Sequence, residues 1–448
     1  MTGHDDIDYA SRTDVGIRRS HNQDAHVVMP ATDPHEFRQR GHVFLVADGM
    51  GGHAVGELAA KIAVDNIPHI YSKHTEEGPE AAIRKAFLEA NCSINNRGNQ
   101  NREFRGMGTT AVTLILRPEG AWVANVGDSR VYRVRRGHIE QLSFDHSWVW
   151  ELARKYNKRP EEVSGVGANR ITRSLGPDPL VQVDVDGPHS VQPGDVFLLC
   201  TDGLSGQVND REIGAVVSVL PPEEACEFLV HLANLQGGID NVTVAVIRVG
   251  GPEEGADSEA NRRPRISVAA IAAAVGRRAA TVLRRLPWAF MLLGAGLLLA
   301  IAALAMTAFH TPGYYLAFVF AGLAILGGLV GVMVQNFRET RGKPAAAPVP
   351  RPIVVHRTTP CPIEPALLER LAQATRDLEE SVHEKGWQLD DDAYHNQLQQ
   401  AQSATERNAL REAFAAQCRA LMVLMTAVAQ QRNREESFRP LWDRPAVG

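Results

Sequence analysis

The sequence predicts a mixed α and β domain, followed by a pair of membrane-spanning helices and a C-terminal helical region. Three observations lead to this fold class. Within residues 1–250, short β-rich runs alternate with turn signals and helical stretches. Two long uncharged apolar runs follow within residues 287–336, and residues 365–434 are rich in Gln, Glu, Ala and Leu. The α+β class therefore applies to the first part of the chain.

Composition excludes several classes of function. The chain has 448 residues with 47 Lys and Arg against 52 Asp and Glu, and this slightly negative balance predicts no binding to nucleic acid. Its five cysteines lie far apart, which argues against a disulfide framework or a cysteine zinc site and fits a reducing compartment. The motifs HExxH, GxxxxGK(S/T) and GxSxG are absent, so the sequence offers no zinc protease, P-loop or nucleophile-elbow chemistry.

The two apolar runs predict a transmembrane hairpin over residues 287–336. Trp288–Phe309 and Tyr314–Val334 have 22 and 21 residues, contain no charge, and are each long enough to cross the roughly 30 Å hydrocarbon core. Buried core helices are the alternative, but helices of this length usually keep a polar face. Only four residues separate the runs, so both flanking arms are expected on the same side of the membrane.

Basic residues indicate which side that is. They flank both runs, whereas the hairpin loop contains neither Lys nor Arg, so both arms are expected in the cytoplasm, with a two-pass anchor in the cell membrane. The first ten residues, MTGHDDIDYA, lack the apolar stretch of a signal peptide. Residues 251–286 read as a linker and a basic juxtamembrane stretch, whose arginines either contact anionic membrane lipid or only mark the topology.

The C-terminal part predicts an interaction function. Residues 337–364 read as a Pro/Ala-rich, semi-rigid linker. Residues 365–434 predict two helices with a break near Lys385–Trp387, and they contain no catalytic-looking cluster. We therefore interpret them as a helical interaction or oligomerisation module.

Aspartates mark the ends of four strand-like runs in residues 1–250. Asp24 precedes one run, Asp48 and Asp202 each follow one, and Asp240 lies just before a fourth. Aspartate is depleted inside strands, but at a strand end its carboxylate can point into a shared cleft. Oxygen-only ligands suit Mg or Mn rather than Zn. For any single Asp-Gly pair an ordinary turn is the alternative, and it becomes less convincing for the whole set.

Eight motifs in order resemble the metal-dependent type-2C protein serine/threonine phosphatases in their bacterial form. The resemblance covers residues 8–248, slightly more than half of the chain. The motifs are Thr13–Asp24, Val46–His53, Gly106–Thr110, Val126–Arg130, Asp145–Ser147, Ile171–Gly176, Thr201–Leu204 and Asp240–Thr243.

The resemblance implies a four-layer α-β-β-α sandwich over residues 1–250, with a two-metal Mn or Mg centre at one end. It implies that water activated by the metals hydrolyses phosphoserine and phosphothreonine. By the same resemblance, Asp48 bridges both metals, the Gly49 carbonyl binds one of them, Asp202 and Asp240 hold the other, Asp24 completes the shell, and Arg19 binds the substrate phosphate. Arg18 is adjacent to Arg19 and remains an alternative for the phosphate.

The sequence departs from the family pattern, or leaves it open, at three positions. Met50 stands where some members have a histidine that is credited as the general acid. Asp128 matches a residue linked to a third, weaker metal, but Gly206 replaces an Asp that often assists there, so the third ion stays in doubt. The segment 148–170 falls where the family has a mobile flap beside the active site.

These features together predict a membrane-anchored phosphatase that acts on phosphorylated proteins in signalling, opposite a Ser/Thr kinase, with lipid contacts through the hairpin. Two alternatives remain at this point. A pseudophosphatase would use the same domain as a phosphoprotein-binding scaffold, and the lost metal ligand that would favour it is not seen among the four core aspartates. The fold could also serve a small phosphorylated metabolite.

Overall fold

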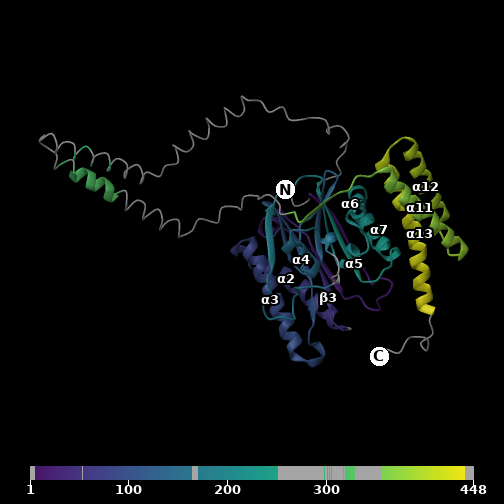
Figure 1. Cartoon of the computed structure of the whole chain (residues 1–448), viewed down its shortest axis with the longest axis horizontal. Helices are drawn as coiled ribbons and strands as arrows, with labels where there is room; N and C mark the ends of the chain where they lie inside the picture. The colour runs from purple at the N-terminus through teal and green to yellow at the C-terminus, as the bar shows by residue number, and fades with distance from the viewer. Residues whose placement is uncertain are drawn as a thin grey trace. The chain divides into compact units, whose positions relative to one another are not determined.

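The computed structural model describes residues 6–52, 54–163, 170–250 and 355–438, together with some helical residues between 297 and 327. It divides into two compact units: Met1–Glu253 with Pro348–Gly448, and Glu254–Ala347. Each unit is described by itself. In the first unit, β-sheets lie between helices on either side (Figure 1).

Two antiparallel sheets form the centre of the first unit. The β10 sheet has the order β1 (Ile7–Asp14), β11 (Val242–Val249), β10 (Val196–Cys200), β7 (Arg130–Arg135), β8 (His138–Gln141) and β12 (Arg357–Pro360). The β3 sheet has the order β2 (Asp24–Met29), β3 (His42–Met50), β5 (Ala111–Arg117), β6 (Gly120–Val126) and β9 (Asp184–His189), and β4 (Gly108–Thr109) pairs with β3.

Strand β3 shows why its sequence is continuously apolar. Successive residues of a strand face opposite sides of the sheet. Phe44 and Val46 lie in the buried cluster between the sheets, which also contains Phe197 and Ile247 from the β10 sheet. Leu45 and its alternate neighbours lie in a second cluster with the helices that cover the other face. Both faces of β3 are therefore buried, so the strand does not alternate between apolar and polar residues.

Helices cover the outer face of each sheet. The β3 sheet carries α2 (Ala54–Lys73) and α3 (Pro79–Gln100), and the β10 sheet carries α6 (Asp210–Val219) and α7 (Pro222–Leu235). These pairs lie on opposite sides of the sheets in Figure 1. The shorter elements are α1 (Pro34–Gln39), α4 (Trp148–Tyr156), α5 (Asp202–Ser205) and the 3-10 turns Thr75–Glu77, Arg102–Phe104 and Pro160–Glu162. The α-β-β-α layers expected from the resemblance are present.

The C-terminal region has three helices rather than the two that the sequence predicts. They are α11 (Pro365–Glu384), α12 (Asp391–Glu406) and α13 (Leu410–Phe438). Gly386 has a positive φ of 62° after α11, in the region of the predicted break, and Asp390 caps α12 by accepting the Ala393 N–H. The second break is at Asn408, with φ 58°. Asparagine tolerates this left-handed conformation, and no glycine or proline marks the break in the sequence.

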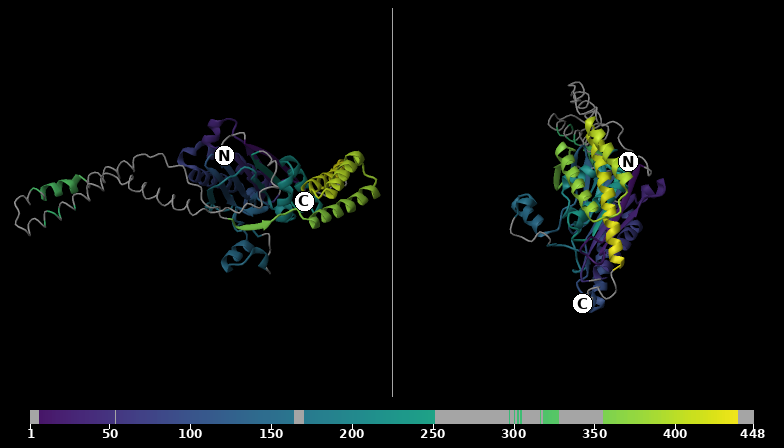
Figure 2. Two further views of the ribbon diagram at one scale, coloured as in Figure 1. Left: turned by 90° about the horizontal axis from the view of Figure 1, so that it is seen from above. Right: turned by 90° about the vertical axis from the view of Figure 1, so that its right-hand side faces the viewer.

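This helical region is not a separate module, which corrects the interpretation made from the sequence. Phe414, Cys418 and Leu421 of α13 lie in the same buried cluster as the residues of α6 and α7. Arg419 pairs with Glu224 of α7 at 2.7 Å. The predicted linker over residues 337–364 also contains β12, which pairs with β8. An apolar face that could have served oligomerisation is therefore buried within the chain itself. Figure 2 shows α13 as the long yellow helix.

The predicted hairpin lies largely outside the described residues, as does the linker over residues 251–286. The described part of the hairpin includes a short apolar helix, Phe318–Gly327. Within the described chain, Leu410–Gln431 is the one helix long and apolar enough to cross a membrane. This segment belongs to α13, and 61% of its apolar window is buried. Packing within the first unit, against α6 and α7, therefore accounts for its apolar character.

Candidate metal centre

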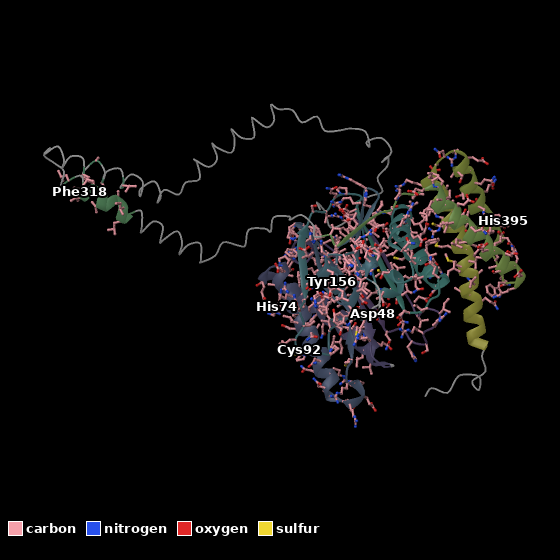
Figure 3. All side chains as sticks on the ribbon, in the orientation of Figure 1. Asp48, His74, Cys92, Tyr156, Phe318 and His395 are labelled. Carbon is pink, nitrogen blue, oxygen red and sulfur yellow. The ribbon has the colours of Figure 1, made fainter. Side chains whose placement is uncertain are left out.

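Five aspartates meet at one end of the sandwich. Asp24 and Asp48 are direct partners across β2 and β3. Asp202 follows β10, Asp240 precedes β11, and Asp128 lies in the turn before β7. Cys200 of β10 is opposite both Arg130 of β7 and Val244 of β11, so these three strand ends share one edge of the sheet. Figure 3 labels Asp48 within the first unit.

The buried, mutually repelling carboxyl groups of this cluster favour the binding of a cation. The pKa of Asp24 is raised to about 7. Burial is the largest cause and repulsion from neighbouring carboxylates adds to it, whereas two hydroxyl hydrogen bonds act in the opposite direction. Burial, followed by repulsion from Asp202 and Asp145, raises the pKa of Asp128 to about 8. Burial and repulsion by the surrounding aspartates hold the pKa of Asp48 well above its usual value. The pKa of Asp202 is also raised, chiefly by burial. A bound cation would reverse these shifts by favouring the ionised forms.

Unpaired buried oxygens show where such a cation fits. One carboxylate oxygen on each of Asp24, Asp128 and Asp202 is buried without a hydrogen-bond partner in the described part of the chain. Leaving a buried polar atom unpaired costs about 1–3 kcal/mol. Within the described residues, no three acidic, histidine or cysteine groups form a closed cage around a single ion. Ions of the Mg type need no such cage, because they keep several waters and take one or two carboxylates.

Two threonines hold Asp24 and join the two sheets. Its Oδ2 accepts hydrogen bonds from the hydroxyls of Thr201 at 2.9 Å and Thr243 at 2.7 Å. The Thr201 hydroxyl in turn accepts the Thr243 N–H at 3.0 Å. Because Oδ2 is fully used in this way, Oδ1 is left free to face a ligand. Sequence reasoning assigned no role to either threonine, although each is an end residue of one of the aspartate motifs.

The Gly106–Thr110 motif supports Asp48. The Thr109 hydroxyl and the Thr110 N–H both donate to the Asp48 carbonyl at 2.8 Å, and the Thr110 hydroxyl accepts the Asp48 N–H at 3.0 Å. Thr110 also hydrogen-bonds the hydroxyl of Ser129 at 2.7 Å, beside Asp128. This motif is therefore the scaffold that fixes the orientation of Asp48.

Asn241 organises the loop that carries Arg19. Its amide donates to the carbonyls of Val15 and His21, and its side-chain oxygen accepts the Gln23 N–H. Arg19 Nη2 lies 2.8 Å from Asp240 Oδ2, and its side chain is 47% exposed. Of the two neighbouring arginines, the structure thus brings Arg19 against one of the five aspartates.

Gly49 allows two backbone segments to meet beside Asp48. A Cβ added at this position would lie 2.1 Å from the Gly56 carbonyl oxygen and 2.6 Å from that of Gln23. We therefore expect Gly49→Ala to disrupt this end of the sandwich and lower the melting temperature by several degrees. Gly52→Ala is the matched control, because a Cβ there meets nothing within 4 Å. Equal melting temperatures for the two variants, measured by thermal unfolding, would contradict this account.

The base of the predicted flap lies next to Asp128. The His146 N–H donates to the Gly127 carbonyl at 2.9 Å, and the Thr172 N–H donates to the His146 carbonyl at 2.7 Å. The flap contains α4 and the 3-10 turn Pro160–Glu162, and residues 164–169 lie outside the described residues. Gly206, at the position of the missing Asp, ends α5 and donates its N–H to the Asp202 carbonyl at 2.7 Å.

Comparisons with known proteins agree on this part of the chain. A family model described as protein phosphatase 2C matches residues 12–151, which include Arg19, Asp24, Asp48 and Asp128. A putative protein phosphatase 2C-type protein of Streptococcus pyogenes serotype M6 is 35% identical over 243 residues, which cover 53% of this chain and 95% of that protein. The serine/threonine phosphatase stp of Listeria monocytogenes is 33% identical over 253 residues, which cover 55% of this chain and 98% of that protein. One similar solved structure is the catalytic domain of the serine/threonine protein phosphatase PstP in complex with two manganese ions. Its sequence is 29% identical, and the match covers 55% of this chain and 99% of the PstP chain, with a TM-score of 0.47.

Proposed function

The chain belongs to the protein phosphatase 2C family and is a protein serine/threonine phosphatase, and from this premise we propose that its five aspartates form the catalytic metal centre. As a member of this family the enzyme uses manganese or magnesium. The observation that carries the assignment is the set of three buried carboxylate oxygens without partners on Asp24, Asp128 and Asp202. The pKa values of these three aspartates are raised chiefly by burial, and repulsion from neighbouring acidic groups acts in the same direction.

The five aspartates differ in position, and we assign each a role accordingly. Asp48 is within hydrogen-bond reach of Asp202 and is repelled by all four other aspartates, so we assign it the bridging position. Asp202 and Asp240 come from the β10 sheet and would hold one ion, and the Gly49 carbonyl would hold the other. Asp24, fixed by two threonines, completes the shell. Asp128 would hold the third, weaker ion. Two divalent ions, when bound, supply charge neutralisation and an activated water for attack on phosphorus.

Arg19 is the residue that we assign to the substrate phosphate. Its planar guanidinium suits bidentate contact with phosphate oxygens, and its exposed position leaves it accessible. It pairs with Asp240, and this ion pair keeps the side chain beside the centre. Met50 follows the Asp-Gly pair and carries no transferable proton. The leaving oxygen therefore takes its proton from water or from a residue other than Met50.

The test is manganese-dependent release of phosphate by the full chain from a phosphothreonine peptide, measured beside a phosphorylated sugar. Release that requires the metal and prefers the peptide supports the proposal. Release from the sugar alone would favour the metabolite alternative. A folded protein that binds manganese but releases no phosphate would favour the scaffold alternative, which currently has no support because all the acidic positions are retained.

We further propose that the hairpin over residues 287–336 anchors the enzyme in the cell membrane, with both arms in the cytoplasm. The support is the absence of charge in both apolar runs and the arginines on both flanks. The helix Phe318–Gly327 also exposes large apolar side chains, among them Phe320, Leu323 and Leu326, as expected of a helix that faces lipid. Protease protection of tags at both ends tests this topology, and one protected end would contradict it.

A further inference from the structure

Strand β12 lies C-terminal to the predicted hairpin over residues 287–336 and forms an edge of the β10 sheet. It runs antiparallel to β8, with Arg357 opposite Gln141 and Pro360 opposite His138. Backbone hydrogen bonds continue at both ends: the His356 N–H donates to the Gln141 carbonyl, and the Cys361 N–H donates to the Gly137 carbonyl. Displacement of β12 would therefore break the backbone pairing along this edge of the sheet.

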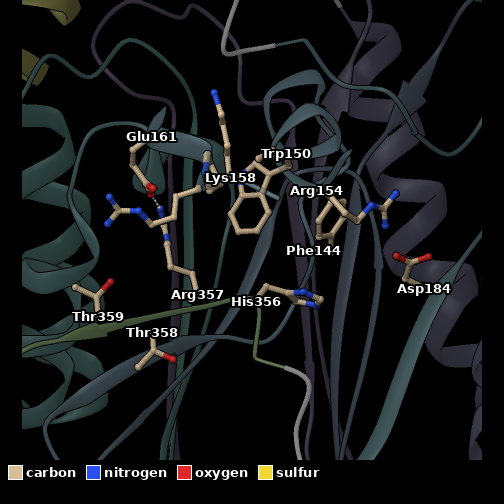
Figure 4. A pocket seen from close by; sticks show the side chains of 13 residues that line it. Phe144, Trp150, Arg154, Lys158, Glu161, Asp184, His356, Arg357, Thr358 and Thr359 are labelled. Atoms are coloured by element: carbon tan, nitrogen blue, oxygen red, sulfur yellow. Dashed lines mark hydrogen bonds and ion pairs between the residues drawn. The ribbon is translucent and has the colours of Figure 1, made fainter. Parts of the chain in front are cut away.

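Arg357 of β12 joins the flap to the body of the domain. Its Nη1 donates to Oε1 of Glu161, in the 3-10 turn of the flap, at 2.9 Å. Its Nη2 lies 2.6 Å from Oδ2 of Asp210, at the start of α6. The guanidinium also lies 5.9 Å from the centre of the Trp150 ring on α4. Figure 4 shows Arg357 between the flap residues and β12.

A polar chain continues from the same arginine toward the metal centre. Asp210 accepts a hydrogen bond from the Tyr132 hydroxyl at 3.0 Å, and that hydroxyl accepts one from Arg130 at 2.8 Å. Arg130 pairs with Asp145 at 2.7 Å. Arg130 and Asp145 are both close enough to Asp128 to influence its ionisation. One residue of β12 thus reaches both the flap and the surroundings of the catalytic aspartates.

The two parts of the flap are seated differently: α4 buries Trp150 and Ala153, whereas the 3-10 turn Pro160–Glu162 has no buried residue. A cavity of about 690 Å³ lies between α4, the 3-10 turn and β12, and its lining includes Phe144, Lys158, His356 and Thr358. In both views of Figure 2 the α4 segment stands away from the body of the sandwich. Two ion pairs of the described chain connect the flap with the rest of the unit: Glu151 with Arg173 at 3.3 Å, and Glu161 with Arg357. A segment held by few discrete contacts above a cavity can move when one of them is lost.

We propose that Arg357 is a positioning residue for the phosphatase reaction, which holds the flap beside the active site by tying it to β12. This inference rests on the proposed function, because the flap can affect catalysis only if the neighbouring centre is catalytic. Displacement of β12 from β8 would remove the Glu161 contact and release the flap. Binding of protein substrate would then weaken, whereas the chemistry at the centre would remain.

The test compares Glu161→Gln, Arg357→Met and the double variant in the full chain. We expect each single change to raise KM for a phosphothreonine peptide about 2- to 5-fold, the range of a partly exposed ion pair. Turnover of the small substrate p-nitrophenyl phosphate should change less than about 2-fold. Without Arg357, loss of the Glu161 charge should have no further effect, so the double variant should match Arg357→Met. Glu162→Gln is the control, since Glu162 pairs with Arg159 inside the same turn.

Tryptic cleavage of the native protein after Lys155 and Lys158 provides a readout that does not depend on activity. Release of the flap should accelerate cleavage in Glu161→Gln and Arg357→Met but not in Glu162→Gln. Unchanged cleavage together with unchanged KM would overturn the proposal, and so would additive effects in the double variant. If the wild type released no phosphate but cleavage still responded to the tether, the proposed function would fail and the tether would stand.

Discussion

Asp48→Asn is expected to reduce manganese-dependent phosphate release by at least about 100-fold, since even indirect contacts to a metal typically contribute 10- to 100-fold. Asp48 is the aspartate that the other four repel, and it lies within reach of Asp202. An amide at this position cannot bridge two cations, because it offers one neutral oxygen in place of a carboxylate. The measurement is phosphate release from the phosphothreonine peptide across a manganese titration.

The same variant should leave the metal-free fold as stable as the wild type or more stable. In the absence of metal, the Asp48 carboxylate is buried against like charges, and asparagine removes that repulsion. Activity and metal-free stability are therefore expected to change in opposite directions, whereas a purely structural residue would lose both. Asp65→Asn, on the exposed surface of α2 beside Lys61, is the control and should alter neither property. A destabilised, active Asp48→Asn protein would contradict the bridging role.

Metal-free protein is expected to lose stability as the pH rises from about 4 to about 8. The pKa of Asp24 is raised to about 7 and that of Asp128 to about 8, from an ordinary value of 3.8. Below pH 4, both the folded and the unfolded chains hold these protons, so the raised pKa values cost nothing. As the pH rises, the unfolded chain releases its protons first, which favours unfolding until the folded groups also ionise. Each unit of pKa shift corresponds to about 1.4 kcal/mol.

Manganese should reverse this trend, since it binds the ionised carboxylates and competes with their protons. The increase in melting temperature on adding manganese should therefore be larger at pH 8 than at pH 5. Thermal unfolding with EDTA and with manganese at both pH values provides the measurement. Asp48→Asn serves as the control and should show a smaller metal effect at pH 8. A metal-induced increase that is equal at the two pH values would exclude the aspartates as the binding groups.

Much of the catalytic domain could be predicted from the sequence, because its signals are local. The apolar run before Asp48 predicts a buried strand, and the family motifs indicate where each aspartate lies relative to a strand. Strand β3 extends through Asp48 to Met50, three residues beyond the apolar run that ends at Ala47, because β4 pairs with its end. Asp128, Asp202 and Asp240 converge because β7, β10 and β11 are neighbours in one sheet, whereas Asp24 and Asp48 are partners across β2 and β3 of the other.

The supporting contacts could not be predicted in the same way. Thr243 reaches Asp24 across 219 positions of sequence, and Asn241 reaches Gln23 across 218. Hydroxyl and amide side chains occur on many strands and turns, so their role depends on which segments the fold brings together. No local pattern distinguishes Thr201 from an ordinary threonine at the end of a strand.

The amino-acid sequence by itself determined the family, the acidic set that we propose for the metal centre and the two apolar runs, because each depends on residue types at fixed local spacing. Only the tertiary structure decided that the C-terminal helices pack on α6 and α7, and that β12 completes the β10 sheet and ties Arg357 to the flap. Burial of an amphipathic face and pairing of a sheet edge require a partner surface. That surface lies more than 100 residues away along the chain, across the hairpin.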